Sequence, residues 1–480
     1  MSITSAAPAN VETADPQSAE TKLANLLQDL RERLPELEIH EPSAATRKYG
    51  VDWATQGELR KEVDGPAVAV PASVTEVQEV VRAAAAHGVS IVPRGAGSGL
   101  AGGARATANQ LVLTTERLNR ILEVSPLDEL AVVEPGVLNK ALNEHLEPFG
   151  LFYAPDPASW DISTIGGNVA TNAGGLRCVK YGVTRESILA LDLVLADGER
   201  ITVGQRSIKG VTGLDLRSLL IGSEGILAIV VGITVRLRPI PVARQTVSVA
   251  FEDTISGAKA LAAITRSAVR PSVIEFIDGA TLEAIDRHSG TNLSERGGAL
   301  ALIELDGFGI QEQFAQLDLA LRSAGGKVRA ESAADAEVLW ELRRNGRGFP
   351  SDEWFVTSDI AVPKSKIADV FAHLPELEAR FGVKISAVAH AGDGNLHPGI
   401  SLRIPEGADP SEPDPVLHEA MDALVDFALS LGGTITGEHG LGTIKREYAA
   451  TELSARNLKV QRAIKRAFDP QDLLNPGKAI

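Results

Sequence analysis

Apolar residues recur every three or four positions between Lys22 and Leu37, and this spacing places them on one face of an α-helix. A strand–helix–strand unit is predicted next. Two short apolar runs, Ala67–Val70 and Ser90–Val92, flank an amphipathic stretch at Ser73–His87, for which Ser73 is a suitable N-cap.

From residue 111 the pattern changes to short β-branched runs separated by Gly, Pro and Asp-Gly. Asp197-Gly198 is typical of a two-residue hairpin turn, and Pro239 with Pro241 indicates a domain boundary near residue 242. Strands are predicted at Leu111–Thr114, Ala131–Val133, Leu189–Leu195, Arg200–Val203 and Gly225–Arg238.

Beyond residue 242, strands and helices alternate with short loops. This alternation predicts a separate α+β domain in which helices back an antiparallel sheet. The strands are predicted at Thr246–Phe251, Val273–Ile277, Ala299–Leu305 and Gly326–Arg329, and the helices at Thr254–Ser267, Gly279–His288, Ile310–Ala324 and Asp414–Leu431.

The composition is that of an acidic globular protein. Hydrophobic residues at 44% and charged residues at 23% of 480 leave enough apolar surface for a sizeable core. The net charge of −16 opposes binding to nucleic acid and to anionic membranes. One cysteine, Cys178, excludes an internal disulfide framework.

No targeting or membrane segment is predicted. The first twenty residues are small, polar and acidic, so we expect a disordered tail at 1–20 rather than a signal peptide. The longest apolar run, Ile226–Val235, is far shorter than the roughly 20 residues that span a bilayer. We expect a cytoplasmic protein, and its association with a membrane through a partner is left open.

The first chemical signal is the glycine-rich run from Pro93 to Gly103. Gly97, Gly99 and Gly102 match G-x-G-x-x-G, but the Rossmann fingerprint needs a helix that opens at the glycines, and an extended run follows here. A flexible surface loop is one interpretation. The favoured one is a loop whose backbone comes close to a phosphate.

Two further segments, Pro155–Gly175 and Gly213–Ile226, are also rich in glycine and small polar residues. Small side chains let a flat ligand lie against the main chain, while hydroxyl and amide groups bind its polar edge. Together the three segments predict one extended, phosphate-bearing cofactor.

A second signal comes from two histidines, His390 and His397, which bracket a turn tight enough to bring both imidazoles to one face. Glu438 and His439 lie in another glycine-framed loop. Two histidines and a carboxylate are a common set of ligands for a divalent metal with open positions. Hydrogen-bonded structural histidines are the alternative, and the spacing is not that of a zincin.

The FAD-binding domain of the vanillyl-alcohol oxidase/p-cresol methylhydroxylase superfamily resembles this chain in PRGAGSGLAGG, DISTIGGNVATNAGG, GLDLRSLLIGSEGILAIV and FDPQDLLNPGKAI. Its branch of glycolate oxidase subunits, D-lactate dehydrogenases and D-2-hydroxyglutarate dehydrogenases is similar in HAGDGNLH and GEHGLGTIKREY. The resemblance covers nearly all of residues 45–480. It implies an α+β fold with a two-subdomain, PCMH-type FAD-binding domain (21–242), a ferredoxin-like cap or substrate domain (243–430) and a C-terminal segment (431–480) that returns to the FAD domain.

The resemblance also implies which residues bind FAD. The first segment would bind the pyrophosphate, the second the ribityl chain and isoalloxazine, and the third the adenosine end, while Asn475 would approach the flavin. The residues implied are Arg94, Gly95, Ala96, Gly97, Ser98, Gly99, Gly102, Gly103, Ser163, Gly166, Gly167, Asn168, Asn172, Gly174, Gly175, Asp215, Glu224, Gly225 and Ile229. Covalently flavinylated relatives carry a histidine in the first segment. Ser98 and Gly99 stand there in this chain, so the resemblance implies non-covalent FAD.

For the chemistry, the resemblance implies a divalent metal (Zn or Mn) at His390, His397 and Glu438, with His439 as the catalytic base. The base would take the substrate hydroxyl proton while flavin N5 accepts hydride. Arg343 would bind the substrate carboxylate with its planar fork. The alternative for Arg343 is a solvated helix face.

The implied function is an FAD-dependent dehydrogenase that oxidises a D-2-hydroxy acid to the 2-keto acid. Relatives selective for a second carboxylate carry a lysine where Thr357 and Ser358 stand, so D-lactate or glycolate is favoured over 2-hydroxyglutarate. Two alternatives stay open. One is a flavin-dependent transferase of the alkyl-dihydroxyacetonephosphate synthase type, although its run of consecutive histidines has no counterpart here. The other is a metal-dependent hydrolase without flavin. The electron acceptor, any partner subunit and the oligomeric state, a homodimer included, are also open.

Overall fold

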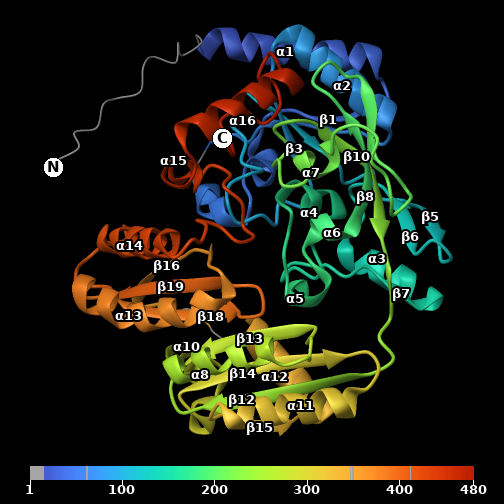
Figure 1. Ribbon diagram of the computed structural model, residues 1–480. Coiled ribbons are helices and arrows are strands. Elements are labelled where there is room, and N and C mark those ends of the chain that lie inside the picture. The colour runs from blue at the N-terminus through green and yellow to red at the C-terminus, as the bar shows by residue number, and fades with distance from the viewer. Residues whose placement is uncertain (1–15, 61–62, 346–347, 349–350, 411) are drawn as a thin grey trace.

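The computed structural model describes residues 16–60, 63–345, 348, 351–410 and 412–480, and Figure 1 shows an upper lobe above a lower sheet layer. The upper lobe begins with α1 (Pro16–Arg33). Residues 16–20 of the predicted tail are therefore helical, while residues 1–15 lie outside the described part of the chain. Leucines of α1 pack against valines and alanines of α2 (Val74–His87), which confirms the first predicted apolar face.

The first sheet of the upper lobe has the strand order β1-β2-β4-β3. Strands β2, β4 and β3 run parallel, as a β-α-β unit requires, and β1 pairs antiparallel at the edge. Ser73 caps α2 by accepting the N–H of Glu76, and Gly88 ends it with φ 64°. The strands are β1 (Glu38–His40), β2 (Ala67–Val70), β3 (Ile91–Arg94) and β4 (Leu111–Thr114).

The second sheet is antiparallel, in the order β5-β6-β10-β8-β9, and the turn at Asp197-Gly198 joins β8 to β9 as predicted. Sequence reasoning missed β5 because its residues are mostly half-exposed and include Glu123. The strands of this sheet are β5 (Ile121–Ser125), β6 (Leu130–Val133), β8 (Ile188–Val194), β9 (Arg200–Gly204) and β10 (Ile229–Arg236). β7 (Leu151–Phe152) and β11 (Arg238–Pro239) pair in a separate two-stranded sheet. The helices of this region are α3 (Asn139–Leu146), α4 (Ile165–Thr171), α5 (Cys178–Tyr181), α6 (Thr184–Ser187) and α7 (Leu216–Leu220).

The lower layer is one antiparallel sheet in the order β15-β12-β14-β13-β18-β19-β16, with β17 also paired to β19. Helices on this sheet bury its apolar face, which confirms the predicted α+β class. The strands are β12 (Arg244–Phe251), β13 (Val273–Asp278), β14 (Ala299–Asp306), β15 (Lys327–Ala330), β16 (Glu353–Thr357), β17 (Ile360–Ala361), β18 (Lys384–His390) and β19 (Asn395–Arg403). The helices are α8 (Thr254–Ala260), α9 (Ala262–Arg266), α10 (Gly279–Ser289), α11 (Ile310–Ser323), α12 (Ala333–Asn345), α13 (Ile367–Phe381) and α14 (Val416–Ser430).

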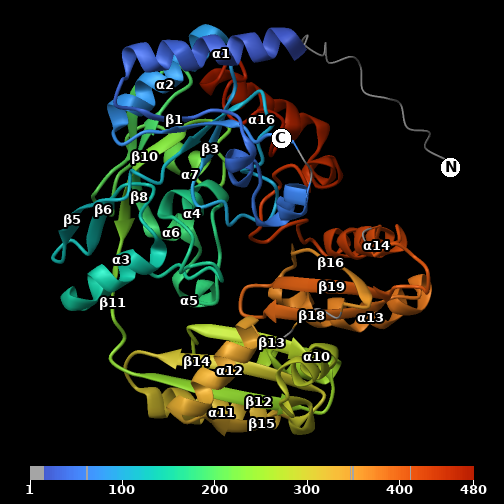
Figure 2. The same cartoon turned by 180° about the vertical axis from the view of Figure 1, so that it is seen from behind.

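After α14 the chain returns to the upper lobe, where α15 (Ala449–Glu452) and α16 (Ala455–Phe468) lie in both views (Figures 1 and 2). Ile91 in β3 donates its N–H to Leu473 and accepts one from Asn475, so the end of the chain runs along the edge of β3. The domain boundaries inferred from the sequence stay predictions. Within the described ranges, no helix has both the length and the apolar composition needed to cross a membrane.

Candidate active site

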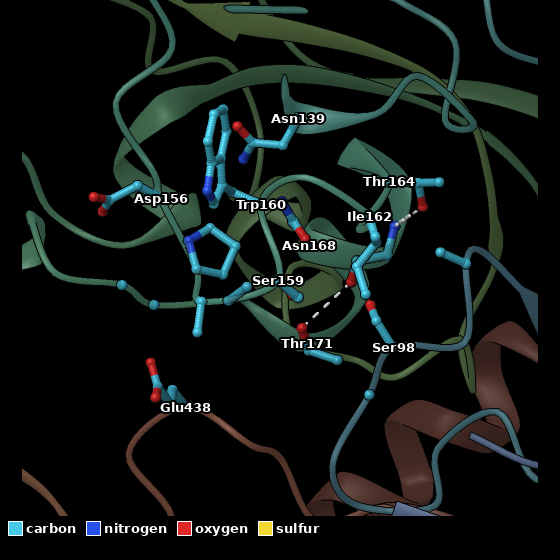
Figure 3. A pocket seen from close by; sticks show the side chains of 18 of the residues that line it. Ser98, Asn139, Asp156, Ser159, Trp160, Ile162, Thr164, Asn168, Thr171 and Glu438 are labelled. Carbon is cyan, nitrogen blue, oxygen red and sulfur yellow. Dashed lines mark hydrogen bonds between the residues drawn. The ribbon is translucent and has the colours of Figure 1, made fainter. Parts of the chain in front are cut away.

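A cavity of about 1530 Å³ lies between the upper lobe and the lower sheet. Glycine-rich segments of the upper lobe form one wall, and residues of β18, β19 and the Gly437–Gly440 turn form the other. In Figure 3, Glu438 stands on its own loop across the cavity from Trp160 and Asn168. The volume exceeds the roughly 300–1,000 Å³ of ordinary ligand pockets, so it has room for an extended cofactor and a small substrate together.

Most of the residues predicted to bind FAD line this cavity. They are Arg94, Gly95, Ala96, Gly97, Ser98, Gly99, Gly103, Gly166, Gly167, Asn168, Gly174, Gly175, Glu224, Gly225 and Ile229. Gly102, Ser163, Asn172 and Asn475 do not reach its surface. Asp215 does not reach it either, because its carboxylate caps α7 by accepting the N–H of Ser218 and is exposed to solvent. The expected contact of Asp215 with adenosine therefore has no support in its position.

Two of the predicted residues, Arg94 and Asn475, make hydrogen bonds within the protein that hold the cavity wall in place. The Arg94 guanidinium donates to the carbonyls of Val51 at 2.6 Å and Lys48 at 3.1 Å, so these N–H donors are satisfied within the protein. Asn475 is buried, and its Nδ2 donates to the carbonyls of Gly103 at 2.9 Å and Glu224 at 2.7 Å. The C-terminal segment thus fixes two of the glycine-rich segments relative to each other.

The cavity wall fits a large flat ligand with a polar edge. A Cβ at Gly95 would lie 2.5 Å from Thr164 Oγ1, and a Cβ at Gly174 would lie 2.6 Å from Glu438 Oε2. The Nδ2 of Asn168 is buried and has no hydrogen-bond partner among the described residues. Buried polar atoms are rarely left unpaired, so a donor that faces a cavity indicates a bound group that accepts from it. FAD is flat enough to lie against this bare backbone, and its flavin carries acceptors for such a donor.

Gly175 gives a direct test of this wall. A Cβ there would lie 2.4 Å from the carbonyl oxygen of Asp156, a backbone atom that cannot move aside alone. We expect Gly175→Ala to lower the free energy of unfolding by about 1–3 kcal/mol, the usual cost of overpacking, and to lower the FAD content per chain. Thermal unfolding and flavin absorbance measure both. Gly57→Ala is the control, because nothing lies within 4 Å of its added Cβ, and an equal loss there would contradict the prediction.

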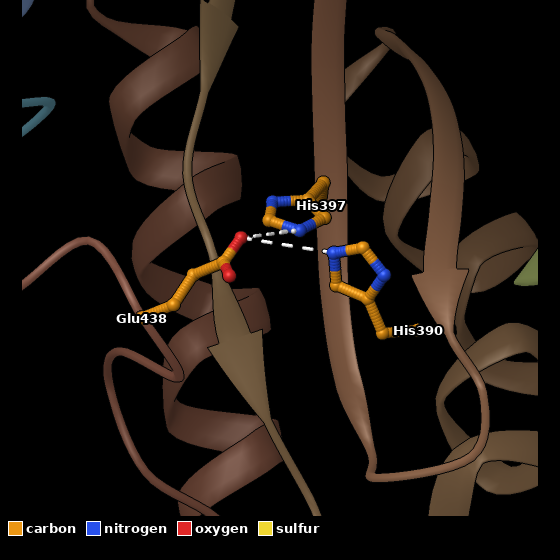
Figure 4. A group of neighbouring side chains, drawn as sticks. All are labelled: His390, His397 and Glu438. Atoms are coloured by element: carbon orange, nitrogen blue, oxygen red, sulfur yellow. Dashed lines mark ion pairs between the residues drawn. The ribbon is translucent and has the colours of Figure 1, made fainter. Parts of the chain in front are cut away.

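The hairpin β18–β19 brings the two predicted histidines together. Its register pairs His390 with Asn395 and Val388 with His397, so both imidazoles project from one face, and their ring centroids are 5.0 Å apart. Glu438 Oε1 lies 3.7 Å from His390 Nε2 and 3.1 Å from His397 Nε2, as Figure 4 shows. One ligand atom of each residue falls within 4.8 Å of the others, which suits a divalent metal.

Glu275 lies behind this group and was missed by sequence reasoning. It is fully buried in β13, and its Oε1 lies 2.6 Å from His390 Nδ1. With the carboxylate of Glu275 beside Nδ1, Nε2 of His390 is turned toward Glu438. A carboxylate in this position is the usual support for a metal-binding histidine. Burial alone would lower the pKa of His390, but Glu275 and Glu438 together outweigh burial and raise the pKa well above the ordinary value.

Arg343 pairs with the second oxygen of Glu275, from which its Nη2 lies 2.5 Å away. Its side chain lines the cavity and is almost buried, so it is not part of a solvated helix face. Its Nε has no hydrogen-bond partner within the described part of the chain. Arg343 is therefore both a counter-ion of Glu275 and a donor that a ligand can use.

Glu438 and His439 project from the Gly437–Gly440 turn toward the histidine pair. The ring centroid of His439 lies 5.4 Å from that of His397, and its Nε2 lies 4.0 Å from Glu438 Oε1. Burial raises the pKa of Glu438, but the bonds with His390 and His397 outweigh it and hold the pKa well below its usual range. Burial lowers the pKa of His439, so the neutral form that can accept a proton is favoured.

A second buried acid lines the cavity near the glycine-rich wall. Burial raises the pKa of Asp156 to about 6, and Arg177 opposes that shift from 3.8 Å. Thr357 and Ser358 also line the cavity, where they add hydroxyl groups and no charge. No motif singled out Asp156 or Arg177, because their pairing depends on how the second glycine-rich segment folds.

Comparison with known proteins agrees with this architecture. The family model of the FAD linked oxidase C-terminal domain matches residues 240–479, and that of an FAD binding domain matches residues 66–204. The glycolate oxidase subunit GlcD of Bacillus subtilis (strain 168) is 37% identical, over 86% of this chain and 88% of its own. The D-lactate dehydrogenase of Archaeoglobus fulgidus is 32% identical, over 92% of this chain and 97% of its own. A structure of p-cresol methylhydroxylase with bound substrate is similar in fold, with a TM-score of 0.76 at 16% identity over 98% of both chains.

The two family models and the relatives thus define an FAD-linked oxidoreductase, and its fold is similar to that of p-cresol methylhydroxylase. The chain belongs to the FAD-linked oxidase family, in the branch that holds GlcD, the D-lactate dehydrogenases and the D-2-hydroxyglutarate dehydrogenases. The resemblance inferred from the sequence is confirmed.

Proposed function

We propose that this protein oxidises a short D-2-hydroxy acid, D-lactate or glycolate, to the corresponding 2-keto acid. The observation that carries the proposal is that one cavity joins the FAD-type wall to the group of His390, His397, Glu438 and His439. FAD, bound without a covalent link, supplies the hydride acceptor. A divalent cation, Zn or Mn, held by His390, His397 and Glu438, supplies a Lewis acid for the substrate hydroxyl.

The protein's own residues would bind the substrate and move its proton. His439 accepts the hydroxyl proton at Nε2, because its Nδ1 lies 3.3 Å from Asp359 and its other nitrogen faces Glu438. Arg343 donates to the substrate carboxylate through its unpaired Nε. Thr357 and Ser358 offer no cation for a second carboxylate, which favours short monocarboxylic substrates.

The experiment is anaerobic mixing of the purified flavoprotein with glycolate, D-lactate, L-lactate and D-2-hydroxyglutarate. We expect glycolate or D-lactate to bleach the flavin fastest and to yield 2-keto acid in proportion to the flavin reduced. A flavin that dithionite reduces but no hydroxy acid reduces would contradict the proposal. Turnover without net 2-keto acid would favour the transferase, and chelator-sensitive ester or amide hydrolysis in a flavin-free preparation would favour the hydrolase.

The electron acceptor and the location of the enzyme are also part of the proposal. Reduced FAD must pass its electrons to an acceptor that the sequence does not name, either O₂ or a separate redox protein. We propose a cytoplasmic enzyme that acts alone or as a homodimer and reaches a membrane only through a partner.

A further inference from the structure

Asp359 lies behind the Gly437–His439 turn and outside the lining of the cavity, and no motif includes it. It lies between β16 and β17 and is fully buried. Its Oδ2 accepts the backbone N–H groups of Gly437 at 2.6 Å, Glu438 at 2.8 Å and His439 at 3.3 Å. Three successive amides of one turn thus converge on a single oxygen. Because the turn is irregular, these part-buried amides depend on that oxygen for their hydrogen bonds.

The other oxygen of Asp359 faces charged groups. Lys445 donates to Oδ1 from 2.5 Å and also to the carbonyls of Asp359 and Ile435, so the lysine is fixed and neutralises the carboxylate. The Nδ1 of His439 lies 3.3 Å from the same oxygen. Thr436 donates its hydroxyl to both oxygens at 3.0 Å. Asp359 therefore contacts the backbone of the turn and the imidazole that the turn carries.

The turn is confined from its other side as well. A Cβ on Gly437 would lie 2.5 Å from Asn395 Oδ1, and Asn395 belongs to the same hairpin as both metal-site histidines. The turn is therefore held between Asp359 and Asn395. This fixes the backbone positions from which the side chains of Glu438 and His439 extend.

We propose that Asp359 is a positioning residue, which fixes the Gly437–His439 turn through its amides and orients His439 through Nδ1. The proposal rests on the proposed function for the role of His439. A carboxylate beside Nδ1 favours the tautomer with the proton on Nδ1 and leaves Nε2 free toward the substrate. Asp359 touches neither substrate nor cofactor, so it acts only through the turn and the imidazole.

The decisive variant is Asp359→Asn. It keeps one oxygen for the amides but places an NH₂ donor against Lys445 and against Nδ1 of His439. We expect the limiting rate constant of anaerobic flavin reduction to fall on the order of 10²-fold, the usual effect of a misplaced catalytic group. The substrate dissociation constant from the same titration should change by less than about threefold, because the variant removes no contact with the bound substrate.

Asp286→Asn is the matched control. The Asp286 carboxylate also accepts hydrogen bonds from successive backbone amides, those of Leu293 and Ser294, but it lies outside the cavity lining. It should leave the flavin-reduction rate unchanged. An unchanged rate in Asp359→Asn would overturn the proposal, and so would a loss that only matches the fraction of unfolded or FAD-free protein.

A second measurement does not depend on the substrate. Asp359→Ala leaves the three amides without their acceptor, so Glu438 is no longer held near the histidines. We expect the affinity for Co²⁺ alone, followed by its visible absorption, to fall at least about 10-fold, as for other supports of metal ligands. If no hydroxy acid reduces the wild-type flavin, the proposed function fails while this measurement still decides the role of Asp359. Wild-type Co²⁺ affinity in Asp359→Ala would overturn that role.

Discussion

Replacing His439 by alanine is expected to slow flavin reduction by the best hydroxy acid on the order of 10²- to 10⁴-fold, the usual contribution of a positioned acid or base. The reason is the position of the imidazole beside Glu438 and His397, with one nitrogen turned toward Asp359 and the other toward the metal-site group. Without it, the substrate hydroxyl loses the neutral base that we propose takes its proton when the C2–H bond breaks. Stopped-flow spectroscopy without oxygen measures this rate directly.

The FAD content of His439→Ala should equal that of the wild type, because His439 belongs to the Gly437–Gly440 side of the cavity and not to the glycine-rich segments that fit FAD. His418→Ala, in an exposed position on α14, is the control and should reduce at the wild-type rate. Bleaching of His439→Ala at the wild-type rate would remove His439 from its proposed role and leave the fold assignment intact.

The sequence predicted the parts of the site whose residues lie close together along the chain. His390 and His397 bracket a short glycine turn, so a hairpin was enough to place both on one face. The glycine-rich segments were found in the same way, because a backbone without side chains is visible in the sequence itself. Local strands and helix caps were predicted for the same reason, since each depends on neighbours within a few residues.

The buried acids could not be found from the sequence. Glu275 and Asp359 are single carboxylates in or beside apolar strands, and their partners lie 115 and about 80 residues away. Only the pairing of β13 with β18 brings Glu275 to His390. The prediction for Arg343 was incomplete for the same cause, because nothing in its helix reveals the carboxylate that pairs with it.

Replacing Glu275 by glutamine is expected to weaken both the metal site and the fold of the lower layer. Glutamine leaves the buried Arg343 without its counter-ion, and removing one partner of a buried pair costs about 3–5 kcal/mol. It also replaces the carboxylate at His390 Nδ1 with a neutral amide, and loss of such support lowers metal affinity about 10- to 100-fold. Chemical denaturation and Co²⁺ titration measure the two effects.

The control for this variant is Glu331→Gln. Glu331 is also a buried carboxylate of the lower layer paired with arginines, Arg296 at 3.3 Å and Arg329 at 3.1 Å, but it lies outside the cavity. It should lower stability without changing the Co²⁺ affinity. Equal Co²⁺ affinities in Glu275→Gln and the wild type would show that His390 needs no carboxylate behind it. A change in both variants would mean that metal binding follows the stability of the whole layer, and Glu275 would then have no specific role in it.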